Sequence, residues 1–194
     1  MIEVVREADQ QLFLWLNSQH LPFLDSVMYW ITNKYTWFPL YGLLAVGIFL
    51  RYRWEGLRMI LLIGLIIVAC DQLTSGLMKP LFERLRPCHN PDLANQVHLV
   101  KGCGGKYGFA SSHAANTFGL ATGSWLLLRT WSQGFILGFV WAAIVSYSRI
   151  YVGVHYPLDI VVGGIIGMLV AILLFRLYQV NRHRILKVFP ERYR

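Results

Sequence analysis

The sequence predicts an all-α membrane protein, a polytopic bundle of transmembrane helices, and two observations support this fold class. The first is composition: of 194 residues, 56% are hydrophobic and only 14% are charged, and the mean hydropathy is +0.46. A soluble domain usually has about a quarter charged residues. The second is that aromatic and basic residues gather at the ends of apolar runs, as they do at the two surfaces of a bilayer. We expect residues 1–194 to form a single domain.

The N-terminal segment, residues 1–33, predicts two short helices at the membrane. Apolar residues follow helical spacing in its first part: Leu12, Phe13, Trp15 and Leu16. This pattern favours an amphipathic helix in the membrane interface. Pro22 interrupts it, and residues 23–33 form a second short amphipathic piece. The two pieces either make one broken span, which would be the sixth, or lie flat on the surface.

Five longer apolar runs predict membrane spans. They cover residues 35–50, 57–78, 112–128, 134–148 and 157–178. The second contains Asp71, and a carboxylate at that depth normally faces the interior of the bundle and has a partner. We therefore expect Asp71 to form a structural hydrogen bond to a neighbouring helix and not to take part in catalysis.

The distribution of charge predicts the orientation. Residues 179–194 form a basic tail, which should be cytoplasmic by the positive-inside rule. The polar loop 79–111 and the turn 149–156 then face the periplasm or exterior of a bacterial inner membrane. The net charge of +8 does not indicate nucleic acid, because the basic residues lie at the ends of apolar runs, where membrane lipids are their partners. No oligomeric state is predicted.

Three polar groups meet on this outer side, and together they indicate a phosphate site. They are Lys79 with Arg86, then Ser111-Ser112-His113, and finally Arg149, His155 and Asp159. Pro157 suits the first position of a helix, which places Asp159 in the first turn, close enough to orient His155. The N-terminus of that helix and the Arg149 guanidinium both favour a bound anion.

These residues resemble the signature of the type 2 phosphatidic acid phosphatases, the PAP2 family. The family pattern is Lys-x6-Arg-Pro, then Pro-Ser-Gly-His, then Ser-Arg-x5-His-x3-Asp. This chain matches it at Lys79, Arg86, Pro87, Ser111, His113, Ser148, Arg149, His155 and Asp159. It departs at Ala110 and Ser112, where the family has proline and glycine. Serine keeps the backbone N–H but restricts φ, so the phosphate turn is altered while every catalytic group is present.

The resemblance implies a role for each matched residue. His155 attacks phosphorus and forms a phosphohistidine, Asp159 holds its tautomer, and His113 protonates the leaving oxygen. The groups that hold the phosphate oxygens are Lys79, Arg86, Ser111, Ser112 and Arg149. Phosphoryl transfer depends mostly on positioning and on neutralising charge. Three fixed cations supply this, so we expect neither a metal nor another cofactor, and a pH optimum bounded by two histidines.

The family acts on lipid phosphates and diphosphates, and several branches resemble this chain about equally. We favour undecaprenyl diphosphate as the substrate, because the chain is short and its outer loop is small. Phosphatidylglycerophosphate and lipid A phosphatases are the alternatives. A lipid transporter or a silent scaffold is the alternative from another class. The intact histidines argue against a scaffold, and the absence of paired broken spans argues against a transporter.

Two cysteines in the outer loop, Cys88 and Cys103, predict a disulfide, because an oxidising compartment permits one. A zinc site remains an alternative, since His89 and His98 lie between them and supply two more ligands. A third possibility is that both cysteines are free thiols. Cys70 lies in a span with no other cysteine nearby in the sequence.

Overall fold

The computed structural model describes residues 2–188, and the side chains of residues 3–181, as an all-helical protein. The α-helices are α1 (Ile2–Ser18), α2 (Pro22–Thr32), α3 (Phe38–Asp71), α4 (Lys79–Phe82), α5 (Ser112–Leu128), α6 (Leu137–Tyr151) and α7 (Pro157–Val188). A π-helix, η2 (Gln72–Met78), joins α3 to α4, and the 3-10 turns are η1 (Lys34–Trp37), η3 (Pro87–His89), η4 (Ala94–Gln96) and η5 (Gln133–Ile136). Within the described part the only extended pairing is an isolated bridge between Leu85 and Tyr107.

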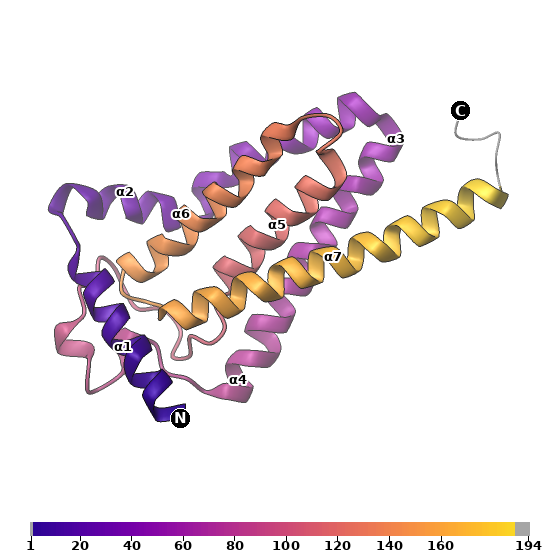
Figure 1. Ribbon diagram of the computed structural model, residues 1–194. Helices are drawn as coiled ribbons and strands as arrows, with labels where there is room; N and C mark the ends of the chain where they lie inside the picture. Colours follow the sequence, from indigo (N-terminus) through magenta and orange to yellow (C-terminus); the bar gives the residue numbers. More distant parts are fainter. Residues whose placement is uncertain (1, 189–194) are drawn as a thin grey trace.

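Three helical segments in the described chain are long and apolar enough to cross a membrane: Lys34–Phe82, Gln133–Tyr151 and Pro157–Asn181. The first has 49 residues and bends at Arg53, where φ is 54°. In Figure 1, α3 doubles back there, so the expected spans 35–50 and 57–78 form its two arms. The fold class is therefore confirmed as helical and membrane-type, while the count of five spans stays a prediction.

The two arms of α3 approach closely because the sequence has a glycine three residues after the bend. A Cβ on Gly56 would lie 2.6 Å from the carbonyl oxygen of Ile48, so no larger residue fits there. Ile48 and Ile66 are both fully buried in the cluster that fills this part of the bundle. The bend thus returns the chain to the end of the bundle at which α4, α5 and α7 meet, called the site end below.

Small residues bring α5 and α7 together and thereby set the spacing of the site. A Cβ on Gly163 would lie 2.4 Å from the Ser111 oxygen, and one on Gly167 would lie 2.1 Å from the Ala115 oxygen. Glycines four residues apart allow two membrane helices to touch along their backbones. Because His113 is carried by α5 and Asp159 by α7, this close contact fixes the two sequence motifs relative to each other.

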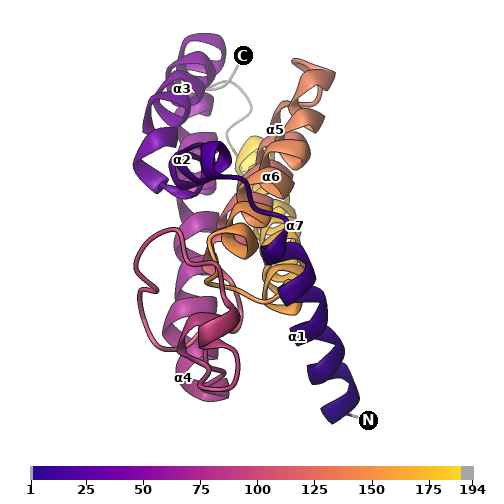
Figure 2. The ribbon, with the colours of Figure 1, turned by 90° about the vertical axis from the view of Figure 1, so that its left-hand side faces the viewer.

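The N-terminal helices pack at the site end (Figures 1 and 2). Three residues of α1 spaced by four, Asp9, Phe13 and Asn17, are at most 4% exposed and face the protein. Leu12 and Trp15 are 46% and 61% exposed and leave an apolar face outward. Neither α1 nor α2 is among the candidate spans, and amphipathic helices were expected in both places.

Two helix ends differ from the predicted ones. The helix that contains 57–78 continues through η2 into α4, so Lys79 is helical and the irregular loop begins only at Glu83. Helical hydrogen bonding extends beyond residue 78, since the amide of Glu83 still bonds the Lys79 oxygen. Helix α7 runs on to Val188, beyond the expected end at 178. The prediction for the basic tail falls mostly on side chains 182–194, which lie outside the described residues.

Candidate active site

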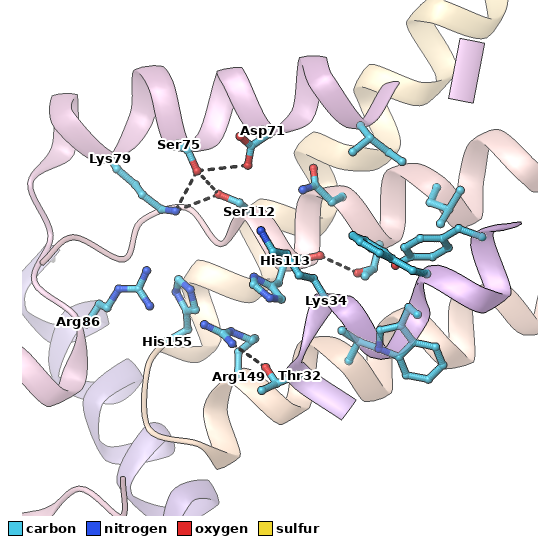
Figure 3. A pocket seen from close by; sticks show the side chains of 18 residues that line it. Thr32, Lys34, Asp71, Ser75, Lys79, Arg86, Ser112, His113, Arg149 and His155 are labelled. Carbon is cyan, nitrogen blue, oxygen red and sulfur yellow. Dashed lines mark hydrogen bonds between the residues drawn. The ribbon is translucent and has the colours of Figure 1, made fainter. Parts of the chain in front are cut away.

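A cavity of about 390 Å³ lies at the site end, and its walls come from residues 32–41, from α3 with η2 and α4, from α5 and α6, and from Arg86 and His155. At one end are charged and imidazole side chains: Lys79, Arg86, His113, Arg149 and His155. The other end is lined by apolar and aromatic side chains: Trp37, Phe38, Tyr41, Ile67, Leu120 and Val145. Figure 3 shows the predicted cations and both histidines converging on the same space. The cavity can therefore hold a phosphate at one end and an apolar chain at the other.

His155 lies in the turn before α7, and the carboxylate of Asp159 holds its ring. Their side chains are at most 2% exposed, and Nδ1 of His155 is 3.3 Å from Oδ2 of Asp159. The amide of Tyr156 donates to the same Oδ2 at 3.0 Å. Burial lowers the pKa of His155 well below its ordinary value, and the cations Arg149, Arg86, Lys79 and Arg84 lower it further. A neutral ring with Nδ1 engaged leaves Nε2 as a nucleophile.

Arg84 joins Asp159 to the N-terminal helix, a contact that sequence reasoning missed. Its guanidinium donates to Oδ1 of Asp159 at 2.8 Å and to Oδ2 of Asp9 at 2.6 Å. It also lies over the ring of Tyr156, 4.2 Å from the centroid. Asp9 in turn accepts from the amide of Leu158 at 2.9 Å. The sequence carried no signal for this contact, since an aspartate in an interfacial helix is usually solvated.

Lys79 is held by hydroxyl groups. Its Nζ donates to Oγ of Ser112 at 2.9 Å and to Oγ of Ser75 at 3.2 Å, and these two oxygens are 2.7 Å apart. The hydroxyl of Thr74 adds a third contact to Ser112 at 2.9 Å. Asp71 lines the cavity and accepts from Ser75 at 3.4 Å. We expected Asp71 to bond a residue of a neighbouring helix, but its partner is Ser75, one turn further along the same helix. Ser75 in η2 also contacts Ser112 of α5.

The other predicted phosphate ligands occupy different positions. Arg149 donates to Oγ1 of Thr32 at 2.6 Å, while its Nε is buried with no partner in the described structure. Arg86 donates to the Tyr107 oxygen at 3.3 Å and lines the cavity. The Ser111 hydroxyl accepts from the amide of Ala114 and caps α5, and it is fully buried outside the cavity lining. Ser112 takes its place at the cavity wall.

The two loop cysteines are joined. Cys88 and Cys103 form a disulfide with 6.0 Å between their Cα atoms. The two histidines proposed for the zinc alternative have separate partners: His89 contacts the Gly104 oxygen and His98 contacts Asp25. The geometry thus permits an oxidised pair, and its presence in the isolated protein stays a prediction. Cys70 is buried and free.

Comparison with known proteins assigns this chain to a family. The family model of the PAP2 superfamily matches residues 58–183. A lipid A 4'-phosphatase from Bacteroides thetaiotaomicron is 41% identical over 86% of this chain and 75% of its own. A lipid A 4'-phosphatase from Porphyromonas gingivalis is 37% identical over 94% of this chain and 78% of its own. The crystal structure of a phosphatidylglycerolphosphate phosphatase of PAP2 type from Bacillus subtilis aligns with a TM-score of 0.69, at 26% identity, over 91% of this chain and 87% of that one.

The geometry of the site and the similarity to these proteins together define a membrane-embedded hydrolase of lipid phosphates. This chain belongs to the PAP2 superfamily, as its three motifs indicated. It is a membrane lipid phosphatase, and the expectation of an enzyme, in preference to a transporter or scaffold, is confirmed.

Proposed function

We propose that His155 and His113 carry the reaction in two steps. In the first, Nε2 of His155 forms a bond to phosphorus, the bond to the lipid oxygen breaks, and His113 gives that oxygen its proton. In the second, water attacks phosphorus, the bond from phosphorus to Nε2 of His155 breaks, His113 takes the proton of the water, and inorganic phosphate leaves. The observation that carries this proposal is that both rings line one cavity, with Asp159 behind only one of them. The ring with the carboxylate behind it is the better nucleophile.

The phosphate oxygens are held by Lys79, Arg86 and Arg149, helped by the hydroxyl of Ser112 and backbone N–H groups near the start of α5. Three fixed cations neutralise the charge that spreads over the equatorial oxygens in the transition state. The unpartnered Nε of Arg149 supports this role, since a buried guanidinium donor normally has an acceptor. Ser111 acts indirectly by capping α5. We expect full activity in excess chelator.

As substrate we propose the phosphorylated sugar lipid, lipid A, in place of the undecaprenyl diphosphate that the sequence alone favoured. The Bacteroides and Porphyromonas relatives, both named lipid A 4'-phosphatases, support this choice through their identity over most of the chain. The cavity supports a lipid phosphate in general, because a charged end and an apolar end are joined. Undecaprenyl diphosphate and phosphatidylglycerophosphate are the alternatives to be tested.

We propose five membrane spans in the bacterial inner membrane, formed by the two arms of α3, by α5, by α6 and by α7. The loop 83–111 would then face the periplasm or exterior, and the C-terminus the cytoplasm. The bend at Arg53 supports the count, since it divides a 49-residue segment that is too long for one crossing. Helices α1 and α2 would lie in the interface at the periplasmic face.

The test is release of inorganic phosphate by purified protein in detergent. Lipid A, undecaprenyl diphosphate and phosphatidylglycerophosphate are presented at equal surface concentration, with and without excess chelator. Preferential turnover of lipid A, unaffected by the chelator, is the expected result. Turnover of undecaprenyl diphosphate alone would overturn the substrate proposal, and a strict requirement for added Mg²⁺ would overturn the role given to the three cations.

A further inference from the structure

Between its charged end and its apolar end, the cavity has a polar band that phosphoryl transfer does not use. On the α3 side, cavity-facing residues follow one another every four positions, and in Figure 3 Lys79, Ser75 and Asp71 lie in that order along the helix. The next position, Ile67, is apolar. On the α5 side, Asn116 lies between His113 and the apolar Leu120.

The band offers hydrogen-bond acceptors. Oδ1 of Asn116 is buried and has no partner within the described residues. Asp71 presents a carboxylate to the same cavity, and its one recorded hydrogen bond, from Ser75, is long at 3.4 Å. A buried acceptor without a donor is costly and uncommon, so Oδ1 of Asn116 calls for an explanation. A ligand that brings hydroxyl or amide N–H groups to this level would satisfy them.

The depth of the band relates it to the leaving group. Helix α5 begins at Ser112 and rises about 1.5 Å per residue, so Asn116 lies about 4.5 Å deeper than His113. If His113 protonates the leaving oxygen, the atoms joined to that oxygen lie one helical turn further in, beside Asn116 and opposite Asp71. Apolar side chains begin only one turn deeper again, at Leu120.

We propose that Asp71 and Asn116 form a subsite that accepts hydrogen bonds from hydroxyl or amide N–H groups next to the phosphate of the substrate. This inference rests on the proposed function and sharpens it, because it selects among lipid phosphates. An N-acylated amino sugar carries such donors beside its phosphate. Undecaprenyl diphosphate carries none, because the group joined to its leaving oxygen is a second phosphate, an anion without donors that would lie beside the Asp71 carboxylate. A site built for donors rejects a ligand that lacks them.

The experiment compares lipids with and without donors in wild-type protein and in Asn116→Leu, which keeps the volume and removes the acceptor. The donor-bearing lipids are lipid A and phosphatidylglycerophosphate, whose glycerol has a hydroxyl next to the phosphate; the donor-free lipid is dioleoyl phosphatidic acid. We expect kcat/KM of Asn116→Leu to fall about 5- to 100-fold on the first two. On phosphatidic acid it should change by less than about twofold, since no hydrogen bond is lost there.

Two further variants make the outcome decisive. Asp71→Asn keeps an acceptor oxygen but loses its charge, so a smaller loss, again confined to the donor-bearing lipids, is expected. Ser146→Ala is the matched control, because Ser146 on α6 has a buried hydroxyl that finds no partner among the described residues and lies outside the cavity lining. Equal losses on all three lipids, or none, would overturn the subsite. Failure of wild-type protein to hydrolyse lipid A would instead overturn the proposed substrate, and phosphatidylglycerophosphate would still test the subsite.

Discussion

Two carboxylates anchor the two sides of the active site, and their surroundings are opposite in kind. On the side of His155, Asp159 is fully buried and bonded to Arg84, to the ring and to a backbone amide. On the side of Lys79, Asp71 is only partly buried and reaches the lysine through the hydroxyl of Ser75. The first network is closed by an ion pair to α1, while the second opens into the cavity.

The difference shows how one site can combine a fixed nucleophile with an adaptable binding wall. A ring that must attack phosphorus along one line gains from a carboxylate that cannot move. A lysine that neutralises phosphate needs only to stay within reach, and hydroxyl groups can exchange partners when a substrate arrives. We therefore expect substitutions on the closed side to lower kcat, and substitutions on the open side to raise KM.

Removal of the nucleophile should have the largest effect. His155→Ala leaves Asp159 and the cation cluster without the attacking atom, so we expect kcat to fall at least about hundredfold. Phosphate release by protein recovered from membranes measures it, with Ser146→Ala as the control for a buried polar substitution. If His155→Ala retains more than a few per cent of turnover, His155 is not the nucleophile.

The ion pair of the closed side should come next. Arg84→Gln leaves Asp9 and Asp159 buried without their cation, so kcat/KM should fall about 10- to 100-fold. Arg84 is also one of the cations that lower the pKa of His155. Its loss raises that pKa, so His155 remains protonated to higher pH and the acid limb of the pH–rate profile should move upward.

Arg84→Lys separates charge from geometry in the same measurement. It keeps the cation but can reach only one of the two carboxylates well. We expect lower activity with the acid limb where it lies in the wild-type protein. If Arg84→Gln and Arg84→Lys shift the acid limb equally, the electrostatic coupling between Arg84 and His155 is absent and the bridge is only structural.

A smaller change is expected on the open side. Ser112→Gly restores the residue that the family pattern has, and it removes three contacts from Lys79, Ser75 and Thr74. Ser75 still bonds Lys79, so the lysine stays in place. We expect KM to rise about three- to tenfold with little change in kcat. A fall in kcat as large as that of Arg84→Gln would show that the two sides are equally rigid.

The same contrast explains what could be read from the sequence. Residues of the three motifs were predictable because the motifs meet on one side of the membrane and resemble a family signature in order and spacing. The spacing also brought His155 and Asp159 to one helix start. Asp9 and Arg84 were missed because an aspartate in an interfacial helix and an arginine in a loop are usually solvated. Their pairing depends on how α1 docks, and no local pattern specifies that.

On the open side, the sequence predicted the residues but not their partners. Asp71 was expected to face inward, and it does, but η2 supplies its bond from within the same helix. A π-helical turn shifts every following side chain around the axis, and hydropathy carries no sign of it. For the same reason Ser112, expected mainly for its backbone N–H, became a hydroxyl ligand of Lys79.

The weakest effect on rate should come from the loop disulfide. Cys88 packs beside Tyr151, Val152 and Val154 in the turn that leads to His155, so the disulfide braces the closed side. Its loop spans 15 residues, for which loop entropy gives about 3 kcal/mol of stability. Cys88→Ser should therefore lower the unfolding temperature while changing kcat only about twofold, because the Arg84 ion pairs still hold Asp159.

Mass spectrometry of alkylated wild-type protein, with and without reductant, supplies the control: alkylation of both cysteines before reduction would show that no disulfide forms. A loss of kcat comparable with that of Arg84→Gln would mean that the ion pairs alone do not hold the closed side.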